Sequence, residues 1–193
     1  MGVAGSALFW LVLVRLTPKV QFSQHISRWP TDDTRSGMTY CVKMRNKGVR
    51  AIVDVETKVI FRTKGLSART AQSPTAVRLD STHYEVAKMT PTWPRLSLRR
   101  PHSIRLAISP ETTGALTRSP FPPLVRGKAK TGTLSLDDLL SVGDSPCLDL
   151  IVSGTDGWSG RRTVSVHRYH ADDVETGLFE PWGLGLVDSE QPG

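Results

Sequence analysis

A cluster of potential metal ligands lies near the C-terminus of the 193-residue chain, at His167, His170, Asp172 and Asp173. Imidazole and carboxylate groups at such short spacing could hold a transition-metal ion. In a strand, however, His167 shares a face with Tyr169, whereas His170 lies at the corner that follows. The local geometry therefore does not force the ligands to converge. We expect solvent-exposed corner residues, no metal site and no cofactor.

Ser159 is a second candidate for chemistry, because Gly157-Trp-Ser-Gly160 is superficially like a nucleophile elbow. The motif lacks the second spacer residue and no helix is predicted after it, so a turn explains it better. The sequence contains no phosphate-binding loop, dinucleotide fingerprint or zinc motif. We predict that the protein is not an enzyme. The alternative is a soluble or exported β-sandwich that uses the 167–173 corner to bind a ligand or a metal ion, with hydrolysis as one option.

Two runs of alternating residues surround these candidates and would position them. Apolar residues recur at every second position over 148–152 and again at Val164 and Val166, which is the period of half-buried strands. The two runs are expected to pair through a tight loop of more than two residues, in which glycines tolerate positive φ. We predict an interaction loop made by Gly154, Asp156, Gly157, Trp158 and Gly160.

The rest of the chain has the short alternating runs and frequent turns of an all-β fold. Strands are predicted over 40–44, 51–62, 77–79, 84–86 and 103–109. Residues 110–132 contain several prolines and are predicted to form a loop, and a short helix or turn follows with Ser135 at its N-cap. About seven short strands separated by turns favour an immunoglobulin-like β-sandwich. We assign the sandwich to residues 38–182 and a flexible tail to 183–193.

The N-terminal residues 1–19 are predicted to form a short apolar helix. Residues 2–14 carry no charge, and such a helix is about 20 Å long, shorter than the hydrocarbon core of a bilayer at about 30 Å. A cleavable signal, a membrane anchor and a buried helix all remain open, and we favour the anchor because the basic residues follow the apolar run. These basic residues predict a single-pass anchor with the C-terminal domain in the cytoplasm. Residues 20–37 are interpreted as a linker.

The chain is strongly basic, with a formal net charge of +7 and a pI near 9.8. The basic residues are scattered and no aromatic side chains alternate with them, so we predict no nucleic-acid partner. The preference for Arg over Lys, with Asn46 as the single asparagine, is typical of a GC-rich bacterial gene. Cys41 and Cys147 fall in predicted strands and could form one disulfide between facing sheets or remain buried free thiols.

Two segments resemble the cytoplasmic domain of inward-rectifier potassium channels, which is itself an immunoglobulin-like sandwich. The first segment is Tyr40-Cys-Val-Lys-Met-Arg-Asn-Lys-Gly48 followed by Val53-Asp-Val-Glu, and the second runs from Leu148 through the glycine loop to Phe179-Glu-Pro181. The pore helices and the potassium filter of that family are missing.

The resemblance implies a non-catalytic regulatory or protein-interaction module, with a protein partner or a homo-oligomer as the assembly. It also implies that residues 154–160 correspond to the loop that constricts the cytoplasmic pore of those channels. Basic residues that follow the membrane helix would correspond to anionic-lipid contacts. In this chain the lipid-binding candidates are Arg15, Lys19 and Arg28.

Overall fold

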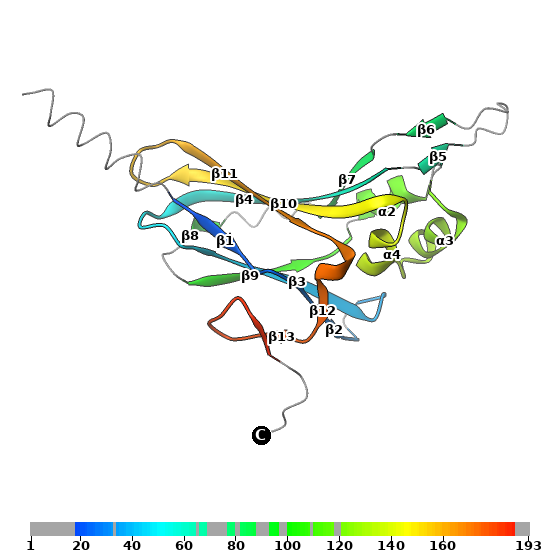
Figure 1. Ribbon diagram of the computed structural model, residues 1–193, viewed down its shortest axis with the longest axis horizontal. Helices are drawn as coiled ribbons and strands as arrows, with labels where there is room; N and C mark the ends of the chain where they lie inside the picture. Colours follow the sequence, from blue (N-terminus) through cyan, green and yellow to red (C-terminus); the bar gives the residue numbers. More distant parts are fainter. Residues whose placement is uncertain are drawn as a thin grey trace, which may run out of the picture.

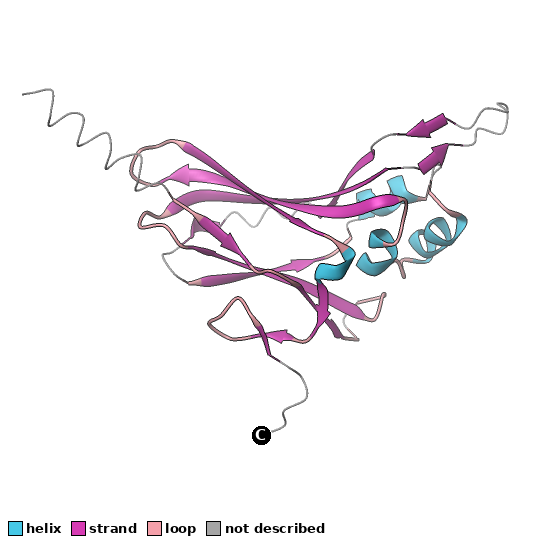
Figure 2. Ribbon diagram, in the orientation of Figure 1, coloured by secondary structure: helices cyan, strands magenta, loops and turns pink. Residues whose placement is uncertain are grey.

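Two β-sheets face each other across an apolar core, and short helices close one end of the space between them (Figure 1). The computed structural model describes residues 18–32, 34–64, 66–68, 77–79, 82–87, 93–96, 100–108, 110–117 and 121–187. Strands make up most of the regular structure (Figure 2). The all-β prediction is therefore confirmed at the level of fold class. The predicted apolar helix at 1–19 lies almost entirely outside the described residues.

The first sheet is built on β3 (Met38–Asn46). One edge of β3 pairs with β1 (Val20–Phe22) and then β2 (Ile26–Pro30), and the other edge pairs with β9 (Pro101–Leu106), all antiparallel. A parallel strand, β12 (Val174–Thr176), extends the sheet beyond β2. The sheet therefore combines strands from the N-terminal half of the chain with β9 and β12 from the C-terminal half.

The second sheet is built on two long strands, β4 (Ile52–Lys64) and β10 (Asp144–Asp156), which pair antiparallel. The other edge of β4 pairs with β7 (Thr82–Ala87) and β8 (Trp93–Leu96), and β10 pairs with the edge strand β11 (Arg162–Tyr169). Two separate hairpins join β5 (Leu66–Ala68) to β6 (Val77–Leu79) and β13 (Leu178–Phe179) to β14 (Leu186–Val187).

The core is filled by side chains that alternate along the central strands. Fully or almost fully buried residues in both sheets include Val42, Met44, Val55, Phe61 and Leu150. The antiparallel pairing of 148–155 with 162–169 confirms the predicted hairpin. Alternation along these strands therefore sets which side chains enter the core.

Residues 110–132 form two helices rather than the predicted loop. They contain α2 (Pro110–Leu116) and α3 (Pro123–Thr131), and α4 (Leu136–Leu140) follows. Proline is tolerated in the first turn of a helix, where its missing N–H has no partner to lose, so these prolines begin helices instead of excluding them. The predicted N-cap is confirmed, because Ser135 and Asp138 form a capping box at the start of α4.

The segment interpreted as a linker, 20–37, belongs to the folded domain. It contributes β1 and β2, with Ser23, Ile26 and Ser27 completely buried. The hydroxyl of Ser23 donates to the carbonyl of His25, and that of Ser27 donates to the carbonyl of Gly177. Buried serines satisfied in this way do not give an apolar pattern, which explains the missed strands. At the other terminus, β14 lies within the segment predicted as a flexible tail.

Cys41 and Cys147 are both buried and free. Burial raises the pKa of each thiol. The sequence left open a disulfide or two buried free thiols, and the structure has the two free thiols.

Candidate functional site

The loop between β10 and β11 is a closed turn that presents Trp158 to solvent. The backbone N–H of Asp156 donates to Arg161 O over 2.8 Å, and that of Gly160 donates to Asp156 O over 2.9 Å. The carboxylate of Asp156 accepts from the Trp158 N–H at 3.1 Å and from the Ser159 hydroxyl at 2.6 Å. These bonds fix the backbone under Trp158, whose side chain is 62% exposed.

Two of the predicted loop glycines have a geometric role. Gly154 lies where the register between β10 and β4 shifts, and a Cβ there would come within 2.5 Å of Ile52 Cγ2 and 3.0 Å of Val53 O. Only glycine allows β4 to approach this closely. Gly160 has φ 68°, in the left-handed region that glycine adopts readily.

Arg50 and Asp156 form a buried ion pair beneath the loop. Arg50 Nη1 donates to Asp156 Oδ2 over 3.1 Å, and the two side chains are 8% and 3% exposed. The guanidinium also lies over the indole ring of Trp158, 4.3 Å from the ring centroid. A desolvated cation needs compensation, and Arg50 receives it from the carboxylate and from the aromatic face.

The carboxylate of Asp156 is held in its ionised form by its surroundings. Burial raises the pKa of Asp156. Hydrogen bonds from Ser159, Trp158 and Arg50, together with the charge of Arg50, lower it by more than burial raises it, so the pKa lies below its ordinary value. The hydroxyl of Ser159 donates to this carboxylate and so closes the turn.

The turn between β3 and β4 holds Arg50 in place. The completely buried amide of Asn46 donates to Arg50 O over 2.5 Å and accepts from the Gly48 N–H over 2.9 Å. Val49, at the outer point of this turn, is 60% exposed. The turn therefore presents an apolar side chain beside the loop that carries Trp158.

Three segments meet at this end of the sandwich: residues 18–19, the 47–51 turn and the 157–161 loop. Lys47 N donates to Lys19 O over 2.7 Å, and Gly157 N donates to Ala51 O over 3.0 Å. We call the surface that these three segments form the basic loop end. Its exposed cations are Lys19, Lys47 and Arg161, and its exposed apolar side chains are Val49 and Trp158, whereas the buried Arg50 is paired with Asp156.

The structure separates the residues predicted to bind lipid. Lys19 lies in the basic loop end, whereas Arg15 is outside the described residues. Arg28 lies on β2, where its guanidinium donates to Asp137 Oδ2 at 2.9 Å and to Thr176 Oγ1 at 3.0 Å. Arg28 pairs with Tyr40 on β3, whereas Val20, next to Lys19, pairs with Asn46 on the same strand. The distance along β3 from Tyr40 to Asn46 is about 20 Å, so Arg28 lies about that far from the basic loop end.

None of the helices that the structure describes has the length and hydropathy required to cross a membrane.

The two histidines of the 167–173 corner differ in their surroundings, since the ring of His167 packs on aromatic side chains and His170 is exposed. The ring of His167 stacks on Phe22, with centroids 5.4 Å apart, and meets the edge of Tyr169 at 4.6 Å. Burial lowers the pKa of His167, and the nearby Asp173 opposes that shift. His170 is exposed, and its backbone N–H donates to Asp173 Oδ2 at 2.7 Å. In the part of the chain that the structure describes, no group of three His, Cys, Asp or Glu side chains could hold a metal ion.

Sequence reasoning missed Arg50 and Val49 as parts of the candidate site. The sequence predicts strands over 40–44 and 51–62, and the residues between them have no pattern that indicates a site. The signal that could have found them is the pairing of Ile52 with Asp156, which brings this turn beside the predicted interaction loop.

No protein-family model matches the sequence, and no curated protein matches it. Solved structures do give matches, among them the crystal structure of Spo0M, a sporulation control protein from Bacillus subtilis. That comparison has 11% sequence identity and a TM-score of 0.29, and it covers 82% of this chain and 49% of that chain. The chain thus spans about half the length of Spo0M, and similarity at this level establishes neither its fold nor its function.

Proposed function

We propose that this chain is a membrane-anchored, non-catalytic β-sandwich that acts as an interaction module, with the basic loop end facing the membrane. The sandwich would be immunoglobulin-like and related to the cytoplasmic domain of inward-rectifier potassium channels. Its two-sheet core and the β10–β11 hairpin are compatible with that relationship. The C-terminal domain would then lie in the cytoplasm.

The proposal is carried by the position at which the apolar N-terminal sequence joins the domain. The described chain begins at Pro18, and Lys19 O accepts from Lys47 N, so the sequence before residue 18 is connected to the domain at the basic loop end. Four residues, 15–18, separate the apolar 2–14 stretch from Lys19, and they reach at most about 14 Å when fully extended. An anchor at 2–14 would therefore keep the basic loop end close to the bilayer surface.

The chemistry of the basic loop end suits an anionic membrane surface. Tryptophan is favoured at the membrane–water interface, and each Lys or Arg near an anionic leaflet contributes about 1 kcal/mol to binding. Trp158 and Val49 are exposed at neighbouring turns, with Lys19, Lys47 and Arg161 around them. The Arg50–Asp156 pair holds the Trp158 loop in place, so little conformational entropy is lost on contact.

The full chain reconstituted into vesicles with brominated acyl chains tests this proposal. Bromine quenches tryptophan emission at the membrane, so replacing Trp158 by Phe should remove part of the quenched signal. Trp29→Phe is the matched control, because Trp29 pairs with Thr39 at the other end of β3 from Asn46, and its loss should leave the quenched signal unchanged. Equal effects of the two substitutions would reject the proposed orientation.

The anchor itself has a separate test. The full chain should float with neutral vesicles even in high salt, because insertion of an apolar helix does not depend on charge. A chain that floats only with anionic vesicles and is released by salt would have a peripheral contact instead of an anchor. A chain that never floats would reject membrane attachment altogether.

A further inference from the structure

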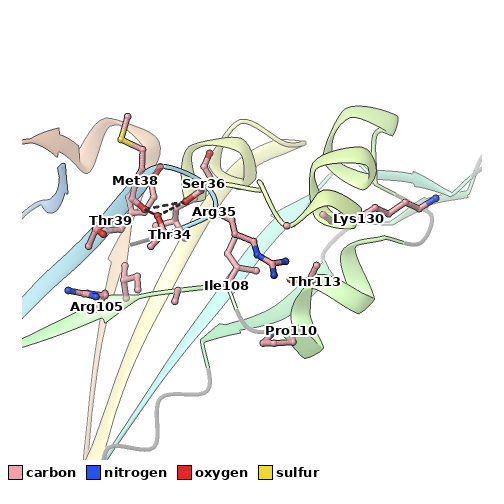
Figure 3. A pocket seen from close by; sticks show the side chains of 17 residues that line it. Thr34, Arg35, Ser36, Met38, Thr39, Arg105, Ile108, Pro110, Thr113 and Lys130 are labelled. Carbon is pink, nitrogen blue, oxygen red and sulfur yellow. Dashed lines mark hydrogen bonds between the residues drawn. The ribbon is translucent and has the colours of Figure 1, made fainter. Parts of the chain in front are cut away.

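A cavity of about 450 Å³ lies at the other end of the sandwich, where the helices meet the first sheet (Figure 3). Its walls come from the turn between β2 and β3, the end of β9, and helices α2, α3 and α4. The volume falls in the range of small-molecule sites. The cavity lies at the Met38 end of β3 and the Leu106 end of β9, whereas the basic loop end lies at the other end of both strands.

The walls combine apolar side chains with positive charge. Apolar surface comes from Met38, Leu106, Ile108, Ala129 and Leu136. The charged residues are Arg35, Arg105 and Lys130, and none of the described residues that line the cavity is Asp or Glu. A site with apolar walls and only positive charges favours a ligand with an apolar body and an anionic group.

Arg35 reaches from the β2–β3 turn into the centre of the cavity, whereas Arg105 and Lys130 lie at its two sides (Figure 3). The Arg35 side chain passes close to Gly132, where a Cβ would lie 3.1 Å from Nη1 and 3.2 Å from Cδ. The turn is fixed by hydrogen bonds from Gly37 N to Thr34 O at 2.9 Å and from the Thr34 hydroxyl to Met38 O at 3.0 Å. Arg35 is thus carried on an ordered turn.

The two carboxylates of α4 beside the cavity are already bound by other groups. Asp137 accepts from the Tyr40 hydroxyl at 2.8 Å and from Arg28 at 2.9 Å. Asp138 accepts from Lys128 at 2.7 Å and caps the start of α4. Within the described ranges, no hydrogen bond or ion pair engages the guanidinium of Arg35. Its charge is therefore available to an external anion.

We propose that this cavity binds a small amphipathic carboxylate, with the carboxylate on Arg35 and the aliphatic chain between Leu106, Ile108 and Leu136. A guanidinium offers two parallel N–H donors that match the two oxygens of a carboxylate. The aliphatic chain would replace water along the apolar walls, which gives selectivity for length. This site is independent of the membrane-facing surface.

Calorimetric titration of the full chain with decanoate, below its micelle concentration, tests the proposal. Saturable binding is expected, and Arg35→Gln should weaken it about tenfold to hundredfold, since a charged hydrogen-bond pair is lost. Arg161→Gln removes a cation from the basic loop end and should leave decanoate binding unchanged. Ile108→Trp, which narrows the cavity without removing charge, should also weaken binding.

Neutral decanol and decyl phosphate separate charge recognition from simple partition into apolar space. Decanol should bind at least about tenfold more weakly than decanoate. Decyl phosphate binding as tightly as decanoate would overturn the assignment to carboxylates. Equal binding of decanol and decanoate, unchanged binding by the Arg35→Gln variant, or no saturable binding would overturn the whole proposal. Thermal unfolding of each variant, with and without decanoate, verifies that the folded protein is being titrated.

Discussion

Arg50 and Asp156 are 106 residues apart in sequence, yet their side chains form an ion pair at 3.1 Å in a place where both are almost completely buried. Desolvation of two charges opposes folding, and such a pair is stable only when further contacts surround it. Ser159 and Trp158 supply those contacts. The pair fastens the β3–β4 turn to the β10–β11 loop and thereby fixes the position of Trp158.

Replacing Asp156 by Asn should destabilise the protein by about 3 kcal/mol. The amide keeps the shape of the side chain but leaves Arg50 without a counter-ion, and removal of one partner of a buried pair typically costs about 3–5 kcal/mol. We expect the lower end because Trp158 still covers the guanidinium. Urea unfolding measures the loss. The exposed Asp172→Asn serves as control, with an expected change within about 0.5 kcal/mol.

The difference in unfolding free energy between wild type and Asp156→Asn should depend on pH. Because the folded-state pKa of Asp156 is lowered, the ionised carboxylate stabilises the fold above the unfolded pKa of about 3.9, and this stabilisation is lost as the pH falls through the folded pKa. Urea unfolding should give a constant difference from about pH 7 to 5 and a shrinking one below about pH 4. A difference that increases on acidification would contradict the assigned pKa direction.

The strands that could be predicted from sequence are those in which apolar residues alternate, as in β4 and β10. The strands that could not be predicted, β1 and β2, have a buried serine between them, Ser23, and another within β2, Ser27. Both serines are satisfied by hydrogen bonds to carbonyl groups instead of by apolar packing. The prolines of residues 110–132 predicted a loop where the structure has helices. Pro110 and Pro123 each begin a helix, because the first turn tolerates a residue without an N–H.

Of the basic loop end, the 157–161 loop could be predicted from the sequence, but its contact with Arg50 could not. Its glycine-rich loop and Trp158 are recognisable in the local sequence, and the loop forms as a tight turn. Arg50 lies in a turn with no distinctive local signal. Its contact with Trp158 depends on the pairing of β4 with β10, and alternation within a strand does not specify which distant strand it will join.

Gly154 and Gly127 should respond in opposite ways to substitution by alanine. A Cβ at Gly154 would come within 2.5 Å of Ile52 Cγ2, so Gly154→Ala should destabilise the protein by about 1–3 kcal/mol through overpacking. Gly127 lies within α3 with no atom within 4 Å of a Cβ, so Gly127→Ala should stabilise by up to about 1 kcal/mol. Denaturant midpoints compare them directly. Destabilisation by Gly127→Ala would contradict the open surroundings of that helix position.

Trp158 should contribute to stability through its contact with Arg50, apart from the membrane contact proposed above, and two substitutions isolate that contribution. Trp158→Phe keeps an aromatic face over Arg50, whereas Trp158→Leu stays apolar but removes the cation–π contact. We expect the leucine variant to lose about 1 kcal/mol in urea unfolding and the phenylalanine variant to lose clearly less.

The exposed Trp182→Leu is the control, because the structure gives Trp182 no cation beneath its ring, within the described residues. If Trp158→Leu and Trp182→Leu changed the unfolding free energy equally, the stacking on Arg50 would contribute nothing measurable. The change in unfolding free energy at Trp158 would then be that of any exposed tryptophan. A larger loss at Trp158 would instead mean that stacking on Arg50 stabilises the turn and fixes the indole in its exposed position.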